Sequence, residues 1–225
     1  MSLIGIIPAR GGSKGIPRKN LKSFYGKPLI AWTIEVAKTV SHIDILVVST
    51  DDKEIAAVAQ DYGAEIPFIR PQEISRDKTP GIIPVLDVLK RVPGYDEVLI
   101  LQPTSPLRTA NDIINIIEIG KSKKASAVVS VTEAEKHPYW SFRLDESSNL
   151  IPWVEGNLNL QRQDLPGAYC LNGALYWGKT DWVIQNETFV TEETLSYIMP
   201  KNRSIDLDTV YDWEIGEFLM SKKNL

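Results

Sequence analysis

A run of glycine and cationic residues near the start of the chain has the composition of an anion-binding loop. The apolar residues 3–8 lead into residues 10–20, which read RGGSKGIPRKN. The three glycines let the backbone approach a ligand and turn its N–H groups inward, and four Arg and Lys side chains add positive charge. These donors suit a triphosphate. The spacing matches neither the P-loop nor the dinucleotide-binding glycine motif, and a mobile solvated loop is the plain alternative.

Two carboxylates near the other end of the chain form a candidate metal site. Asp206 and Asp208 lie two residues apart in an extended stretch, and the strand period of two places both on one face. With no nearby His or Cys, such a pair suits a hard cation, Mg²⁺ above all, which bridges substrate phosphates. Asp208 could instead cap the helix expected after it.

Three polar residues are candidates for contacts with the parts of a ligand other than its phosphates. Arg70 ends an apolar run and Gln102 follows another, positions where ligands collect in open α/β sheets. The guanidinium fork of Arg70 suits a base or ribose edge, although a surface ion pair is the alternative. The amide of Gln102 suits a polyhydroxylated sugar or a plain turn. Arg162 suits a carboxylate, because bidentate pairing favours arginine.

Strand-like and helix-like segments alternate along the chain. Short apolar runs predict strands at 3–8, 45–48, 64–69, 97–101, 127–131, 174–177 and 196–199. Helical periodicity predicts helices behind Pro28, after a cap at Asp51 or Asp52, from 79–80 onward, at 111–121 and at about 209–220. This alternation predicts an α/β fold with a mostly parallel twisted sheet and helices on both faces.

The alternation breaks between residues 133 and 166, a polar stretch with two tryptophans. Long loops inside compact domains are uncommon unless functional, so we expect a protruding hairpin or dimerisation arm here instead of a surface loop. Nothing else in the 225 residues has the composition of a linker. We therefore expect a single domain, residues 1–225, with this arm inserted at about 133–166.

The composition excludes several classes of protein. A net charge of −4 argues against nucleic acid or a membrane surface as the main partner. The single cysteine, Cys170, allows neither an internal disulfide nor a thiolate metal site. No apolar run is long enough to span a bilayer, and the first residues lack the features of a signal peptide. We expect a cytoplasmic protein.

The motifs together resemble those of a known family. Residues 6–20 resemble the N-terminal signature of the CMP-sialic acid synthetases (acylneuraminate cytidylyltransferases), which are sugar-activating nucleotidyltransferases. Further similar motifs follow in the family's order: GKPL (26–29), STDD (49–52), RP (70–71) with DKT (77–79), QPTSPLR (102–108), RQDLP (162–166), NGALY (172–176) and SIDLDT (204–209). The resemblance implies a Rossmann-like fold and the reaction of CTP with a nonulosonic acid, a nine-carbon 2-keto sugar acid, to give the CMP-sugar and pyrophosphate.

The resemblance also implies roles for individual residues. For CTP it implies contacts by Arg10, Gly12, Ser13, Lys14, Lys19, Asn20 and Arg70. It implies Mg²⁺ on Asp206 and Asp208, with Arg10, Lys19 and Asp208 as the catalytic residues. For the sugar it implies Gln102, Arg162, Tyr176 and Phe189, the last two as an apolar shelf for an acylamino group; Phe189 could also be an ordinary core residue. Relatives are homodimers whose arms complete the partner's sugar pocket, so Arg162 would act across the interface.

The choice of sugar stays open at this point. Tyr139 and Trp140 follow His137-Pro138, where some relatives place a lysine, and Thr188 stands where relatives place a second aromatic residue. Legionaminic acid, a diacylamino nonulosonic acid, is therefore an alternative substrate. Two further classes are a non-catalytic nucleotide or sugar sensor and a nucleotidyltransferase acting on sugar 1-phosphates.

Overall fold

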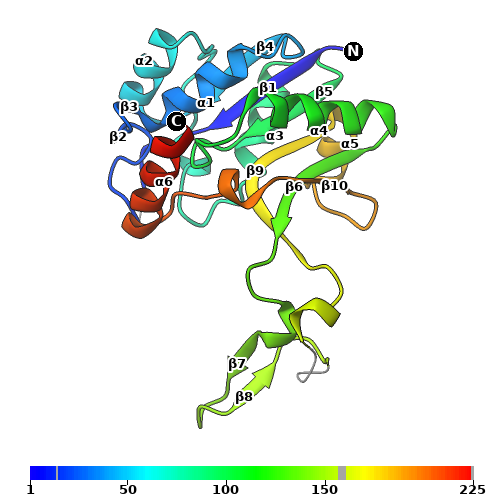
Figure 1. Cartoon of the computed structure of the whole chain (residues 1–225). Coiled ribbons are helices and arrows are strands. Elements are labelled where there is room, and N and C mark those ends of the chain that lie inside the picture. The colour runs from blue at the N-terminus through cyan, green and yellow to red at the C-terminus, as the bar shows by residue number, and fades with distance from the viewer. Residues whose placement is uncertain (14, 157–160, 224–225) are drawn as a thin grey trace.

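A six-stranded mixed sheet forms the centre of this computed structural model, which describes residues 1–13, 15–156 and 161–223 (Figure 1). The strands lie in the order β10 (Leu195–Ile198), β6 (Ala127–Glu133), β9 (Tyr169–Lys179), β5 (Glu97–Leu101), β1 (Leu3–Pro8) and β4 (Ile45–Ser49). β9 is antiparallel to both of its neighbours, and the other pairings are parallel. The expected α/β fold with a mostly parallel sheet is confirmed.

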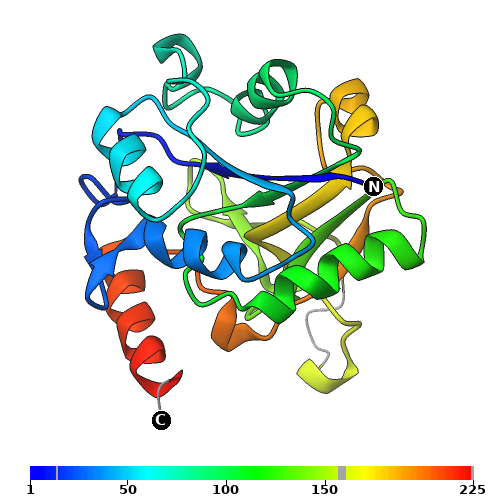
Figure 2. The same cartoon turned by 90° about the horizontal axis from the view of Figure 1, so that it is seen from above.

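Helices cover both faces of the sheet (Figure 2). On one face lie α1 (Leu29–Lys38), α2 (Lys53–Asp61) and α4 (Ala110–Ser122), and on the other α3 (Ile83–Arg91) and α5 (Thr180–Asn186). The last helix, α6 (Val210–Lys223), packs through Trp213 and Met220 on a third apolar cluster that includes Ile16 and Leu207. Among the described residues, no helix is both long and apolar enough to cross a membrane.

Short elements complete the chain. They are the β2 (Ser23–Phe24) and β3 (Lys27–Pro28) ribbon and four 3₁₀ turns, η1 (Gln72–Ile74), η2 (Pro138–Trp140), η3 (Arg162–Asp164) and η4 (Lys201–Arg203). The strand expected at 64–69 is wrong, because Glu65 alone makes a single bridge, with Val47. Pro67 has no N–H to donate to a ladder, which ends any strand there. The helix expected from 79–80 begins later, at Ile83.

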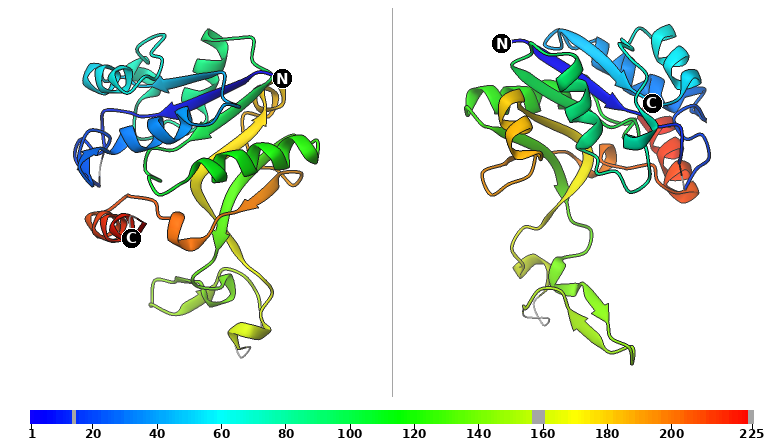
Figure 3. Two further views of the ribbon diagram at one scale, coloured as in Figure 1. Left: turned by 45° about the horizontal axis from the view of Figure 1, so that its top comes forward. Right: turned by 180° about the vertical axis from the view of Figure 1, so that it is seen from behind.

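The polar stretch that interrupts the alternation projects from the body of the molecule (Figure 3). It leaves at the end of β6 and returns at the start of β9, and it contains an antiparallel hairpin of β7 (Phe142–Leu144) and β8 (Leu150–Pro152). We call residues 134–168 the arm. The expected hairpin is confirmed, whereas its part in dimerisation stays a prediction.

A buried carboxylate anchors the segment that carries Asp206 and Asp208. Asp112 is fully buried at the start of α4, where it forms a capping box with Thr109. It also accepts hydrogen bonds from Tyr197 of β10 and, at 2.8 and 3.0 Å, from the Arg203 guanidinium. Burial alone would raise the pKa of Asp112, but these hydrogen bonds outweigh it and lower the pKa to about 2. The Asp112–Arg203 pair thus holds the chain after β10 against the body.

We expect Asp112→Asn to lower the free energy of unfolding by about 2–4 kcal/mol near neutral pH, because it removes a buried charge that Arg203 and the helix cap bind. Since the folded-state pKa lies below the usual value, the ionised carboxylate stabilises the fold above about pH 4, and this contribution is lost as the pH falls toward about 2. Urea unfolding should therefore show a smaller difference between wild type and variant at about pH 3 than near neutral pH.

The matched control is Asp61→Asn, which removes the same charge from an exposed position on α2. Its effect should stay within about 0.5 kcal/mol. Equal effects of the two variants would contradict the anchoring role of Asp112.

Candidate active site

The glycine-rich loop lies at the edge of the sheet where several strands end. It follows β1, while Asp51 and Gln102 follow the adjacent strands β4 and β5. A Cβ atom on Gly15 would lie 2.1 Å from the backbone oxygen of Asp208, so a glycine is required where the loop meets the 206–208 segment. Asn20 is buried, and its amide donates to the carbonyl of Arg10 at 3.1 Å. Asn20 therefore closes the loop on itself.

Two of the predicted phosphate-binding cations are paired with carboxylates. The Lys19 ammonium donates to Asp208 Oδ1 and to the carbonyl of Leu207, both at 2.8 Å. Arg10 donates to Asp77 Oδ1 at 2.6 Å. The structure thus brings Lys19 to the predicted metal pair, 189 residues away in sequence. Gly12 and Ser13 lie in the same loop, and Lys14 lies outside the described residues.

Asp208 does not cap the last helix. Thr209 and Asp212 cap α6 reciprocally, because Asp212 accepts from the Thr209 N–H and hydroxyl while its own N–H donates to Thr209. The capping alternative for Asp208 is wrong, and its carboxylate is exposed except for its contact with Lys19.

The carboxylates of Asp206 and Asp208 fit a divalent cation. Desolvation raises the pKa of Asp206 above its usual range, and the Asp208 charge raises it further. Two neighbouring carboxylates that repel each other form an oxygen donor set for a hard cation. In the part of the chain that the structure describes, no group of three or more His, Cys, Asp or Glu side chains forms a metal site. The two carboxylates would therefore share the ion with other oxygen ligands, such as substrate phosphates.

Two adjoining cavities lie beside the loop. The first, of about 250 Å³, we call the Arg70 cavity; its lining includes Arg10, Arg70, Asp77 and Gln102. The second, of about 340 Å³, we call the Tyr176 cavity; its lining includes Gln102, Tyr176, Thr188 and Phe189. Gln102 and Gly81 line both. Gln102 thus occupies the junction at which a ligand spanning the two cavities would pass.

Arg70 is a buried residue of the first cavity. Its side chain is 3% exposed, and Nε donates to Ser75 Oγ at 2.9 Å. Burial lowers the pKa of Arg70, and the charge of Asp51 opposes that shift. The alternative of a surface ion pair is wrong, because the Arg70 side chain is buried.

The aromatic residues predicted to form a shelf lie side by side. The ring centroids of Tyr176 and Phe189 are 5.8 Å apart. Desolvation raises the pKa of Tyr176, and nearby Asp206 adds to the rise. Phe189 is mostly buried but still forms part of the cavity wall. The pair gives the second cavity an apolar surface next to the predicted metal pair.

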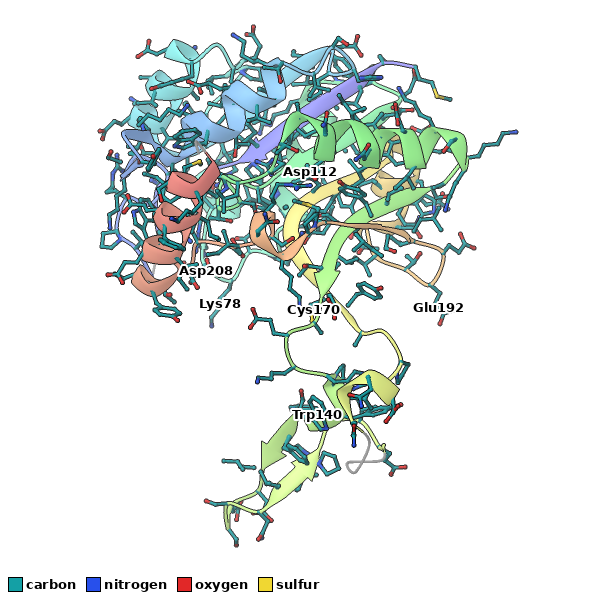
Figure 4. The ribbon with its side chains drawn as sticks, in the orientation of Figure 1. Lys78, Asp112, Trp140, Cys170, Glu192 and Asp208 are labelled. Carbon is teal, nitrogen blue, oxygen red and sulfur yellow. The ribbon has the colours of Figure 1, made fainter. Side chains whose placement is uncertain are left out.

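Arg162 lies apart from these residues. It belongs to η3 in the arm, which projects away from the body (Figure 1). In Figure 4 the arm residue Trp140 is well separated from Asp208 in the body. The side chain of Arg162 lies outside the described part of the structure, so its contact with a sugar stays a prediction.

The sequence left open whether Arg108 contacts the sugar or only caps the loop, and the structure gives it a supporting role. Arg108 is fully buried and donates to the carbonyls of Ala174 and Gln102 and to the Thr33 hydroxyl. Burial lowers the pKa of Arg108 to about 9. Its place in the QPTSPLR motif was the available signal, but nothing in that motif shows that the guanidinium points inward. Asp77, the partner of Arg10, carries no signal beyond the DKT motif.

Comparisons with known proteins agree with this arrangement. The sequence model of the family described as Cytidylyltransferase matches residues 4–145. The chain is 39% identical to the CMP-N,N'-diacetyllegionaminic acid synthase of Legionella pneumophila, covering 98% of this chain and 97% of that protein. It is 33% identical to the N-acylneuraminate cytidylyltransferase of Escherichia coli, covering 99% of this chain and 53% of that one.

A solved structure shares the fold. CMP:2-keto-3-deoxy-manno-octonic acid synthetase, in complex with CTP, superposes with a TM-score of 0.76 at 18% identity, covering 99% of this chain and 100% of that one. The Rossmann-like α/β fold implied by the sequence motifs is thereby confirmed. The chain belongs to the cytidylyltransferase family, among the CMP-sialic acid synthetases that its motifs resemble, and is a nucleotidyltransferase.

Proposed function

We propose that the enzyme transfers CMP from CTP to a nonulosonic acid and releases pyrophosphate. One observation carries the proposal: the cationic loop meets the acidic pair through the 2.8 Å contact of Lys19 with Asp208. Arg10 of the same loop lines the Arg70 cavity, which shares Gln102 with the Tyr176 cavity. A triphosphate on the loop would have its base in the Arg70 cavity, and the Tyr176 cavity would take the sugar. A cytoplasmic location is part of the same proposal.

The reaction is an in-line displacement at the α-phosphorus. The anomeric hydroxyl of the sugar forms the new O–P bond and loses its proton to solvent, while the bond to the β-phosphate oxygen breaks and pyrophosphate leaves. Arg10 and Lys19 supply positive charge to the phosphates, which stabilises the leaving group. Positioning and electrostatics carry the catalysis, so no covalent intermediate on the protein is needed.

Asp206 and Asp208 would hold Mg²⁺. When bound, this ion neutralises charge on the triphosphate. Lys19 already lies against Asp208, so the ammonium would exchange this carboxylate for a phosphate oxygen when the nucleotide binds. Because Gly15 has no side chain, the loop can stay close to the backbone of Asp208 during that exchange.

The Tyr176 cavity supports an acylamino sugar. The tilted aromatic pair of Tyr176 and Phe189 suits the methyl group of an acyl substituent. Thr188 and Gln102, on the same cavity lining, supply polar groups for hydroxyl or amide partners. N-acetylneuraminic acid and N,N'-diacetyllegionaminic acid both have such substituents, and the names of the relatives cover both sugars.

The arm supports a homodimer. Leu144, Leu150 and Trp153 are 64%, 65% and 68% exposed, and an isolated two-stranded hairpin is marginally stable in water. A second copy of the chain that covers these side chains would remove them from water and bring Arg162 of one arm toward the sugar cavity of the other subunit.

A nucleotide-by-sugar matrix tests the reaction. With Mg²⁺ present, we expect CTP together with N-acetylneuraminic acid or N,N'-diacetyllegionaminic acid to release pyrophosphate, measured by a coupled phosphate assay. Sugar 1-phosphates should release none, because the reacting group is a free anomeric hydroxyl. Failure with every nine-carbon 2-keto acid would remove the proposed reaction, and binding of CTP without turnover would favour a sensor.

We expect Asp208→Asn to reduce kcat by on the order of 100-fold, because the charged ligand of the cation is lost, while calorimetry still detects CTP binding. Glu214→Gln, which removes one charge from the exposed side of α6, is the control and should keep wild-type turnover. Unchanged kcat in Asp208→Asn would refute the metal assignment.

Leu150→Asp should convert the dimer to a monomer, because it places a charge within the proposed interface. Light scattering measures the mass, and the KM for the sugar acid should rise by about 10-fold or more if one arm completes the other subunit's cavity. Tyr211→Ser, an exposed aromatic on α6, should leave the dimer intact. A monomeric wild type with full activity would contradict the proposal.

A further inference from the structure

The side chain of Asp51 links two parts of the candidate nucleotide site. Sequence analysis leaves Asp51 and Asp52 as alternative caps of the helix that follows. The structure makes Asp52 the cap, since its Oδ1 accepts from the N–H groups of Glu54 and Ile55. Asp51 is thereby free for another role: its Oδ1 accepts the Gly11 N–H at 2.9 Å and lies 3.6 Å from Arg70 Nη2.

Asp51 is the carboxylate with the largest electrostatic effect on Arg70, and Asp87 has a smaller one. Its backbone N–H is fixed to Thr50 at 2.8 Å, and its Nε to Ser75. A guanidinium that is 3% exposed is costly unless a carboxylate balances it. Arg70 also forms part of the lining of the Arg70 cavity. Without Asp51, the orientation of its guanidinium would rest on the single Ser75 contact.

The start of the loop depends on the same carboxylate. A hydrogen bond from a backbone N–H to a carboxylate is stronger than one to a neutral acceptor. A Cβ atom on Gly11 would lie 2.6 Å from Asp52 Oδ2, so the loop passes tightly over the turn that Asp51 and Asp52 form. Arg10 and Gly12, on either side of Gly11, are predicted contacts of the triphosphate. Asp51 therefore holds the backbone between them.

We propose that Asp51 is a positioning residue that fixes the phosphate loop and the Arg70 guanidinium relative to each other. A single nucleotide then contacts the loop with its phosphates and Arg70 with its base. This inference rests on the proposed function, since it assumes that the base lies in the Arg70 cavity and the triphosphate on the loop. Asp51 then contributes to the affinity for CTP and to its preference over other nucleoside triphosphates without contacting the reacting atoms.

Two substitutions separate the two contacts. Asp51→Asn keeps an oxygen for the Gly11 N–H but removes the charge opposite Arg70, and Asp51→Ala removes both. We expect the Kd for CTP with Mg²⁺, measured by calorimetry without sugar acid, to rise about 3-fold and about 10-fold or more, respectively. The ratio of the Kd values for UTP and CTP should fall toward one in both variants. The KM for the sugar acid should stay within about 2-fold of wild type.

Asp52→Asn is the matched control. It removes the same charge one residue along, and asparagine caps helices as well as aspartate does. Asp52 also pairs with Arg18 of the loop, but that side chain is about half exposed and such a pair contributes little, so CTP binding should stay within about 2-fold of wild type. The proposal is overturned if Asp52→Asn weakens CTP binding as much as Asp51→Asn does. It is also overturned if both Asp51 variants bind CTP and UTP as the wild type does. Thermal unfolding checks folding, and if Asp51→Ala does not fold, the near-isosteric Asp51→Asn decides.

Failure of the proposed function gives a different pattern. If wild type binds CTP but transfers CMP to no sugar acid, the proposed reaction is wrong, while the binding data still decide the role of Asp51. If wild type does not bind CTP, both the reaction and the role of Asp51 are wrong.

Discussion

The contact between Lys19 and Asp208 is the interaction on which the site depends. It joins the loop after the first strand to the segment before the last helix, at a distance of 2.8 Å. The apolar cluster of Ile16, Phe24, Leu207 and Trp213 packs beneath it, and the absence of a side chain on Gly15 allows the two backbones to meet. The ion pair itself contributes little stability, since the Asp208 carboxylate is largely exposed. Its importance is that it places the ammonium group of Lys19 beside the two carboxylates that we propose as metal ligands.

The rest of the fold serves to keep the two segments at that distance. The sheet brings the ends of β1, β4 and β5 to one edge, which places the loop, Asp51 and Gln102 together. The buried Asp112–Arg203 pair ties the chain after β10 to α4 and so directs Asp206 and Asp208 toward the loop. The buried charges of Asp112 and Arg108 hold segments that carry candidate ligand-binding residues, and Arg70 is itself a buried candidate ligand-binding residue. Burying charge is costly, and each of these groups has hydrogen-bond partners that offset the cost.

Much of the fold could be predicted from the sequence, because buried parallel strands are short apolar runs and the helices between them have clear periodicity. The segment 64–69 is the exception: it is as apolar as a strand, yet Pro67 and an edge position leave it with one bridge to Val47. β9 is antiparallel to β6 because the arm connects these two neighbouring strands. The residues 174–177 contain no local pattern that predicts this direction.

Residues of the candidate site could be predicted where their role depends on residue type. They could not be predicted where the role depends on contacts between distant parts of the chain. The glycine loop, the acidic pair and the aromatic shelf have visible compositions, and the structure gathers them at one edge. Asp52 accepts from the N–H groups at the start of α2, whereas Asp51 accepts from Gly11, 40 residues away. Two identical neighbouring residues give no sequence signal for which of them makes which contact. In the sequence, Arg108 has the type and position of a ligand-binding residue, but its guanidinium donates to backbone carbonyls inside the protein.

A crystal structure of the enzyme with CTP and Mg²⁺ would show whether the loop and the acidic pair bind one nucleotide together. We expect the triphosphate to lie along residues 10–20, Asp206 and Asp208 both to contact the ion, and the Lys19 ammonium to have moved from Asp208 to a phosphate oxygen. A nucleotide bound elsewhere, or carboxylates turned away from the ion, would contradict this expectation.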